Sequence, residues 1–459
     1  MWCARSSGAY RFRVRDRLRL RLPLWVTPRF LYILGGIAVA LAAAPGFAPL
    51  LAAAAIAGAA LLIATVADLA IGPRPSRLTV AREPVGHFAL RVAARIDYDV
   101  ENRSAYDVRV GTVETPTRTI AYDDDEAIGD VPPRSRTTFS RAVTPVARGA
   151  DAFGTIYAWY ENRLGLIRRR LVVPAPAPFR VYPDLSAVER YGALRMRNRL
   201  IEAGLRKMRL KGAGTEFESL RDYASGDAFR AIDWKASARR GKLIVAQHEV
   251  ERSQNVMIVL DCGRLMTPRL EDQRKFDFAI TAALSVATIA GLANDKVGAV
   301  AFARDILAAS APRSTRASIA GLSEMLYDLE PRFEESDYAK AFAYLRDRLH
   351  KRSMIVFFTD VIDPVAQSAV LAELGTLAKR HLVVCVFMND AAVANALAAP
   401  VTGAAGSYEA AVALGLDHER RAAAAGLNAR GIITIDVPAR RLTTALIDQY
   451  LRVKARGLI

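Results

Sequence analysis

"NVMIVLDCGRL" (Asn255–Leu265) is the stretch of sequence that decides the fold. Its first half is a short apolar run, and the run ends in an acidic residue, Asp261. Such a run is typical of a strand that is buried on both faces of a parallel sheet. Similar runs follow along the chain, at Lys296–Ala303, Ser353–Asp360, His381–Asp390 and Ile432–Pro438.

Segments with helical spacing separate these apolar runs. They cover residues 271–294, 315–329, 337–350, a segment from Pro364 onward, 406–429 and 440–456. Strands that alternate with helices predict a parallel sheet with helices on both faces. We therefore expect an open, doubly wound α/β domain over residues 253–459.

Acidic residues stand at the ends of several predicted strands. They are Asp261, Asp360 with Thr359 beside it, and Asp390. In a sheet of this kind the functional crevice lies at the carboxyl ends of the strands. The sequence after the first strand, "LDCGRLMTP", is not a glycine-rich phosphate loop. A nucleotide site is therefore not predicted.

The first and middle strands of the predicted sheet both end in aspartate, which resembles the von Willebrand factor type A fold. That fold often holds Mg²⁺ at the motif Asp-x-Ser-x-Ser, whose oxygen ligands suit a hard cation. Here Gly263 and Leu265 stand at the two serine positions. The resemblance therefore implies a degenerate site without metal or other cofactor, whose remaining candidates are Asp261, Thr359 and Asp360.

Two alternatives stay open for this group of residues. Thr315, in an intervening loop, is a further candidate ligand, and with it Mg²⁺ binding remains an alternative. In the other interpretation, Asp261 and Asp360 have a structural role, because strand-end carboxylates also cap helices and accept backbone hydrogen bonds.

A second informative stretch is "GTEFESLRDYASGDAFRAIDWKASARRGKL" (Gly214–Leu243), which mixes charged and aromatic residues and lacks His and Cys. Paired carboxylates could do acid–base chemistry, and interleaved aromatics could stack on nucleic acid. Acidic residues alternate closely with basic ones, however, which favours internal salt bridges over a track for phosphates. We expect a structural clasp whose apolar side chains pack on the α/β domain, namely Leu220, Tyr223, Ile232 and Trp234. Asp227, Arg230 and Asp233 are expected to form ion pairs or backbone caps around Gly226.

The same stretch resembles the signature of the bacterial family known as domain of unknown function 58. The pattern G-x-G-x-E-F-x-x-L-R-x-Y-x-x-G-D-x-x-R-x-I-D-W-x-x-S-A-R begins at Gly212. The positions that the resemblance marks for the signature and for interaction are Glu216, Arg221, Tyr223, Gly226, Asp227, Arg230, Asp233, Trp234, Ser237 and Arg239. It implies a non-enzymatic adaptor or assembly factor that works with a MoxR-type AAA+ ATPase and an unknown protein client.

The N-terminal part of the chain has the pattern of a membrane hairpin. Residues 1–29 hold eight Arg and one Asp, and residues 30–71 hold one charge, Asp68. The segment "APGFAP" (Ala44–Pro49) divides the apolar region into two predicted spans, about 30–47 and 50–70. The positive-inside bias places the N-terminus and the C-terminal domains in the cytoplasm, and the family resemblance implies that the hairpin lies in the inner membrane of a bacterium. A cleaved signal peptide and a buried soluble hairpin are the alternatives.

Between the hairpin and the signature, residues 78–180 alternate apolar and polar residues and carry frequent turn signals. This pattern predicts a small, immunoglobulin-like β-sandwich. Its acidic run, Asp123–Glu126, is expected to be a solvated turn, because it lacks the spacing of a calcium loop. The Pro-rich segment Val172–Leu185 is interpreted as a linker, and residues 186–252 form the signature region, which opens with a predicted helix.

Composition excludes few classes of function. The net charge is +17, which suits an anionic membrane surface or nucleic acid. Cys3, Cys262 and Cys385 lack the spacing of a disulfide framework or a zinc site. We expect a membrane-anchored adaptor with protein partners and without nucleic acid. The alternatives are a metal-dependent hydrolase that uses the strand-end crevice and a binder of anionic lipid or nucleic acid.

Overall fold

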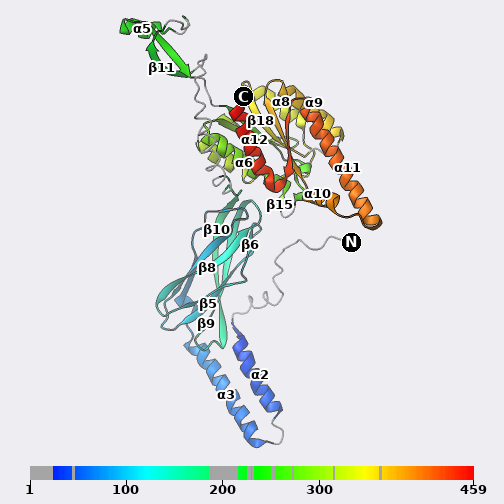
Figure 1. Cartoon of the computed structure of the whole chain (residues 1–459). Helices are drawn as coiled ribbons and strands as arrows, with labels where there is room; N and C mark the ends of the chain where they lie inside the picture. The colour runs from blue at the N-terminus through cyan, green and yellow to red at the C-terminus, as the bar shows by residue number, and fades with distance from the viewer. Residues whose placement is uncertain are drawn as a thin grey trace. The chain divides into compact units, whose positions relative to one another are not determined.

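The computed structural model of the chain divides into two compact units, Met1–Tyr182 and Pro183–Ile459, which are described separately (Figure 1). The structure describes residues 24–43, 47–185, 188, 216–224, 229, 232–249, 254–270, 273–313, 316–360 and 364–458. The predicted helix at the start of the signature region, from Ser186 to Leu210, lies outside these residues except for Val188.

Two apolar helices open the first unit. Helix α2 (Pro28–Ala42) is capped by Thr27, whose hydroxyl accepts a hydrogen bond from the Phe30 backbone N–H. Helix α3 (Ala48–Ile71) has 24 residues and is therefore about 36 Å long, enough to cross a bilayer core. The first predicted span extended to residue 47, but α2 ends at Ala42, before Pro45 and Gly46 in the sequence.

Within the described residues, α3 and α6 (Lys275–Leu292) are both long and apolar enough to cross a membrane. They differ in burial. Most of α6 is covered inside the second unit, whereas α3 leaves nearly all of its side chains exposed. The exposed apolar surface of α2 and α3 is the feature that points, weakly, to a membrane protein.

The rest of the first unit consists of two antiparallel-rich sheets that enclose a common apolar core. One sheet has the order β1 (Leu24–Val26), β10 (Ile167–Tyr182), β9 (Gly149–Asn162), β5 (Val108–Glu114) and β7 (Ala127–Val131), with β3 (His87–Ala89) also paired to β10. The other has the order β2 (Leu78–Arg82), β4 (Ala94–Asn102), β8 (Ser135–Pro145) and β6 (Ile120–Tyr122). Burial alternates along β4, as expected for a strand with one face in a core.

The Pro-rich segment that the sequence suggested as a linker belongs mostly to strand β10, so that interpretation was wrong. Its register against β9 shifts between Pro174 and Ala177. A proline lacks the N–H that a sheet ladder needs, and irregular positions of this kind accommodate it. Asp123, Asp124 and Asp125 are exposed, as predicted for a solvated turn.

The second unit is built on a six-stranded sheet, with the order β17 (Ile306–Arg313), β16 (Lys296–Phe302), β13 (Asn255–Asp261), β18 (Ser353–Phe358), β19 (Leu382–Asn389) and β20 (Ile433–Pro438). Five strands are parallel, and β17 is an antiparallel edge strand that the sequence did not predict. The bulged β17 backbone passes so close to Gly298 that a Cβ there would lie 2.6 Å from the Ser310 carbonyl oxygen.

Helices cover both faces of this sheet, and each face has its own apolar core. Helices α6, α7 (Arg316–Leu326) and α12 (Leu442–Arg456) pack on one face. The other face holds α8 (Tyr338–Arg348), α9 (Pro364–Ala378) and the end of α11 (Gly403–Asn428). Helix α10 (Ala391–Ala398) was not predicted, and α6 begins at Lys275 because a short hairpin of β14 (Arg269–Leu270) and β15 (Gln273–Arg274) precedes it.

The signature region forms a two-stranded sheet of β11 (Glu216–Asp222) and β12 (Ile244–Glu249), with a short helix α5 (Trp234–Arg240) between them in sequence. Helix α5 ends at Gly241, which adopts the left-handed conformation (φ 65°) that ends helices. These elements are small, so their stability depends on a few polar contacts that are described below.

Candidate functional site

The described polar residues at the carboxyl ends of β13 and β18 form the candidate site. Asp261 is the last residue of β13, and Thr359 and Asp360 directly follow β18. The two strands are parallel neighbours, so their ends lie side by side. Asp261, Thr359 and Asp360 are all buried, and the structure brings these three strand-end residues together, whereas Asp390 caps helix α10.

Asp261 accepts four hydrogen bonds. Its Oδ1 accepts one from the Gly263 backbone N–H at 2.8 Å and one from the Ser336 hydroxyl. Its Oδ2 accepts one from the Tyr338 hydroxyl at 2.8 Å and one from the Thr359 hydroxyl at 2.9 Å. Burial raises the pKa of the Asp261 carboxyl above its usual range, and these donors act in the opposite direction. The lone pairs of this carboxylate are thus engaged by neutral groups of the protein.

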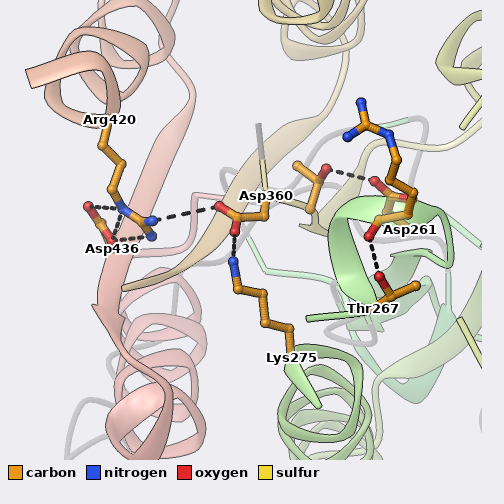
Figure 2. Close-up of polar contacts among 8 residues, drawn as sticks. Asp261, Thr267, Lys275, Asp360, Arg420 and Asp436 are labelled. Carbon is orange, nitrogen blue, oxygen red and sulfur yellow. Dashed lines mark hydrogen bonds and ion pairs between the residues drawn. The ribbon is translucent and has the colours of Figure 1, made fainter. Parts of the chain in front are cut away.

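Asp360 is instead held by two cations. The Lys275 ammonium, in the first turn of α6, donates to Asp360 Oδ2, and the Arg420 guanidinium lies 3.7 Å from Oδ1. Arg420, on α11, also binds Asp436 of β20 through two nitrogens, at 3.0 and 3.1 Å. Figure 2 shows Asp360 between Lys275 and Arg420, with Asp436 beyond the arginine. A buried pair of this kind is costly to break, because it leaves one charge without a partner.

The sequence did not identify Lys275, Arg420, Ser336 or Tyr338 as members of the site. A weak signal existed for Lys275, which is a charged residue within the first turn of an otherwise apolar helix. Ser336 compensates for the hydroxyl that is missing at position 263, since a Cβ on Gly263 would lie 2.0 Å from Ser336 Oγ. That hydroxyl comes from a different loop, so no local motif could reveal it.

These residues do not fit a divalent metal ion. Mg²⁺ needs oxygen ligands with free lone pairs in an octahedral arrangement. Asp261 already accepts four hydrogen bonds, and Lys275 and Arg420 place positive charge against Asp360. Across the described part of the chain, His, Cys, Asp and Glu form no cluster of three or more that could hold a metal. Thr315, the further candidate ligand, lies outside the described residues.

A surface loop, Glu330–Asp337, covers this end of the sheet. The Arg332 backbone N–H donates to the Cys262 carbonyl at 2.7 Å, and the Arg264 N–H donates to the Glu334 carbonyl at 2.8 Å. Between these two anchored points, the Phe333 side chain is 87% exposed. The Phe333 ring is therefore held out into solvent on a loop that is fixed to the strand end.

In the signature region, polar contacts join α5 to β12. Asp233 caps α5, and its Oδ1 accepts a hydrogen bond from the Ala236 N–H at 2.9 Å. The Ser237 hydroxyl donates to the Asp233 carbonyl and accepts from the Ile244 N–H at 2.9 Å. The signature serine and aspartate therefore hold the helix to the strand, and Asp233 is a backbone cap as predicted.

The predicted packing of the clasp on the α/β domain stays a prediction for Ile232 and Tyr223, because the contacts of Ile232 with Val245 and of Tyr223 with Phe229 lie within the signature region. Ile232 is buried and Tyr223 is half-buried, but Trp234 is 62% exposed, so its predicted packing was wrong. Its position in the first turn of the short helix α5 leaves the ring on the solvent side. Arg239 is exposed on the same helix. Gly226, Asp227 and Arg230 lie outside the described residues, and so do the side chains of Leu220, Glu216 and Arg221.

A comparison with family models identifies a related family for part of the chain. Residues 219–404 match the family model described as "Protein of unknown function DUF58". The matched segment runs from the signature region through most of the α/β sheet, and it supports the family that the signature resembles. A curated relative, "Uncharacterized protein YeaD" of Bacillus subtilis (strain 168), is 46% identical over 43 residues, which cover 9% of this chain and 11% of that protein.

Solved structures give weaker similarities. The "conserved hypothetical protein BatB" of Bacteroides thetaiotaomicron is 15% identical, with 44% of this chain and 100% of that chain covered and a TM-score of 0.31. A PapD-like domain of human CEP192 is 10% identical, with 24% of this chain and 90% of that chain covered and a TM-score of 0.19.

Proposed function

We propose that this chain is a non-enzymatic, membrane-anchored adaptor or assembly factor. In this proposal its α/β unit, which resembles the von Willebrand factor type A fold, binds a MoxR-type AAA+ ATPase or a client of that ATPase. Helices α2 and α3 anchor the chain in the bacterial inner membrane, and both units lie in the cytoplasm. The match of residues 219–404 supports the family from which the partner is inferred.

The proposal that the chain is not an enzyme rests on the hydrogen bonds and ion pairs that already occupy the strand-end carboxylates. Asp261 is engaged by four neutral donors, and Asp360 by Lys275 and Arg420. A general base or a nucleophile must have a lone pair that can reach the substrate. Both carboxylates are fully buried and their oxygens face protein donors. This arrangement suits a rigid platform better than a catalytic centre.

Phe333 is the residue we propose as the centre of the docking surface. Its loop is fixed to the strand end by two backbone hydrogen bonds, so the ring is presented at a defined position. Exposed charges surround it, because Arg264 pairs with Glu335 at 2.6 Å and Arg332 lies near Glu334. An apolar anchor within a polar rim is the usual arrangement of a binding hot spot.

The membrane anchor is supported by the exposed apolar side chains of α2 and α3. The orientation follows from charge, because Arg-rich segments precede α2 and follow α3. Such segments stay on the cytoplasmic side of the inner membrane. The two units would then share one compartment with a cytoplasmic ATPase.

The proposed partnership is tested by direct capture. The full chain in detergent is mixed with the purified MoxR-type ATPase of the same genome, with and without a non-hydrolysable ATP analogue. The proposal expects a stable complex in the ATP-bound state. Failure to capture the ATPase with or without the ATP analogue would contradict the proposed partnership. The proposed membrane anchor of α2 and α3 would remain supported.

A metal-dependent hydrolase is the alternative for the same crevice, and calorimetry separates the two. Titration of the full chain with Mg²⁺, Mn²⁺ or Ca²⁺ is expected to give no saturable heat, because the carboxylate oxygens are already engaged. A saturable signal that disappears in Asp261→Asn would favour the hydrolase. Asp305→Asn is the matched control, since Asp305 is an exposed carboxylate that pairs with Lys340.

A further inference from the structure

The sandwich is bound tightly to the two apolar helices at one of its ends. The Thr27 N–H, at the start of α2, donates to the Leu166 carbonyl at 3.0 Å. The Asp68 carboxylate, near the end of α3, accepts from the backbone N–H groups of Leu166 and Ile167 at 3.0 and 2.9 Å. The β9–β10 turn therefore lies between the beginning of α2 and the end of α3.

The same end of the sandwich carries five exposed arginines, which we call the arginine rim. Its members are Arg29, Arg74, Arg77, Arg134 and Arg163. Arg163 belongs to the β9–β10 turn, and the Arg29 guanidinium lies 2.9 Å from where a Cβ on Gly165, in the same turn, would be. Within the described residues, none of the five has a side-chain hydrogen bond or an ion pair to the protein.

Strand pairing places the other rim arginines at this end. Arg77 directly precedes β2, whose first residue pairs with Asn102 at the end of β4. Arg134 directly precedes β8, whose first residue also pairs with Asn102. Arg74 is joined to Arg77 by a backbone hydrogen bond of 2.9 Å. The rim is thus built by four separate segments of the first unit.

Two exposed apolar tips lie among these arginines. Leu164, in the β9–β10 turn, is 49% exposed, and Tyr106, in the β4–β5 loop, is 50% exposed. The acidic residues at this end are Glu101, which is paired with Arg103, and the exposed carboxylates Asp107 and Asp130, so the five rim arginines outnumber them. The opposite half of the sandwich combines exposed arginines with the exposed acidic run Asp123–Asp125. The sandwich is therefore cationic where the apolar helices join it.

We infer that the arginine rim binds the phosphates of anionic phospholipids at the surface of the bilayer that holds α2 and α3. Guanidinium groups suit phosphate oxygens, and cationic side chains near an anionic leaflet are attracted to it. Leu164 and Tyr106 enter the headgroup layer beside them, as interfacial side chains do. This inference rests on the membrane anchor of the proposed function, because only a bilayer around the helices brings its surface to the rim.

The test compares lipid preference at the protein surface. The full chain is reconstituted in phosphatidylcholine bilayers, and association of spin-labelled phosphatidylglycerol and phosphatidylcholine is measured by electron paramagnetic resonance. The wild type is expected to prefer phosphatidylglycerol by about 3- to 5-fold. Replacing four rim residues together, in R74Q/R77Q/R134Q/R163Q, is expected to reduce the preference to nearly 1.

A matched control removes the same number of charges elsewhere on the sandwich. The variant R91Q/R95Q/R118Q/R180Q changes four exposed arginines outside the rim, and it is expected to keep the wild-type preference. If both variants lose the preference for phosphatidylglycerol equally, the inference that the arginine rim binds the lipid is overturned, since net charge would then explain the effect. If the rim variant does not fold, loss of the wild-type preference in high salt still tests the electrostatic basis.

Two further outcomes separate the possible causes of failure. Extraction of the chain from membranes by alkaline carbonate would contradict the membrane anchor itself. Retention in the membrane without any preference for phosphatidylglycerol would contradict lipid binding by the arginine rim and leave the membrane anchor standing. A short RNA or DNA duplex that displaces phosphatidylglycerol at physiological salt would also overturn the inference, because the rim would then be a nucleic-acid surface.

Discussion

At the scale of single residues, the pair of Lys275 and Asp360 is the most consequential interaction of the site. Both side chains are buried, and the ammonium donates directly to the carboxylate. Lys275→Met leaves Asp360 with only the more distant Arg420, and we expect this to destabilise the α/β unit by about 3–5 kcal/mol. Hydrogen exchange of the β13 and β18 amides measures the loss.

The surface pair of Lys340 and Asp305 is the matched control for this change, because both side chains are more than half exposed. Lys340→Met is expected to leave the stability of the α/β unit nearly unchanged, because water screens an exposed ion pair. The double variant K275M/D360N removes both buried charges and should recover most of the loss. Equal effects of Lys275→Met and Lys340→Met would show that the buried pair has no special role.

His381 provides a pH dependence at the start of β19. Its side chain is buried and its Nδ1 has no hydrogen-bond partner among the described residues. Burial lowers the pKa of His381 below its ordinary value of 6.5, and the charges of Arg380 and Arg352 lower it further. The unfolded chain therefore takes up a proton at a higher pH than the folded chain, so the α/β unit loses stability as the pH falls through about 6.5.

Hydrogen exchange of the β19 amides at pH 7.5 and 5.5, corrected for intrinsic rates, measures this dependence. His381→Gln is expected to flatten it, whereas His350→Gln at an exposed position should leave it unchanged. The same slope in wild type and His381→Gln would assign the dependence to other groups.

Residue-level prediction from the sequence succeeded where chain order alone brings residues together. Asp261, Thr359 and Asp360 end neighbouring strands, so a parallel sheet must place them side by side. Ser336, Tyr338 and Arg420 reach the same place through a loop and through the packing of α8 and α11. No periodic pattern encodes such contacts, so a single sequence could not reveal them.

At the scale of elements, the contact of α3 with the β9–β10 turn decides how the first unit holds together. Asp68→Ala leaves the buried N–H groups of Leu166 and Ile167 without an acceptor, which costs about 1–3 kcal/mol for each. We expect loss of exchange protection at these two amides. Thr65→Ala is the control, because the Thr65 hydroxyl donates to the Leu61 carbonyl within the same helix. Unchanged exchange protection of the Leu166 and Ile167 amides in Asp68→Ala would contradict the proposed role of Asp68 in joining α3 to the β9–β10 turn.

Element prediction failed mainly where the sheet departs from regularity. The edge strand β17 contains Pro312 and pairs with β16 through bulges, so its sequence lacks the apolar run of a buried strand. Strand β10 contains alternating prolines, which are typical of linkers, yet it pairs with β9 on both sides of a register shift. The buried parallel strands were predicted because burial on both faces requires continuous apolar residues.

At the scale of the whole molecule, we propose that both units lie on the cytoplasmic side of the membrane. A cysteine introduced at exposed Asp124 of the sandwich reports this directly, because Cys262 and Cys385 are buried. With Cys3 replaced by Ser, D124C is expected to react with a membrane-impermeant maleimide only after the cells are lysed. Labelling in intact cells would place the sandwich outside the inner membrane.

The central claim is that the strand-end surface around Phe333 binds a protein partner. The most direct test is the affinity of the full chain for the purified MoxR-type ATPase, compared between wild type, Phe333→Ala and Leu292→Ala. Leu292 is an exposed apolar residue at the other end of α6, so it controls for general loss of apolar surface. We predict a Kd increase of about 30-fold for Phe333→Ala, which corresponds to a hot-spot loss of about 2 kcal/mol, and no change for Leu292→Ala. Equal affinities of wild type and Phe333→Ala would contradict the claim.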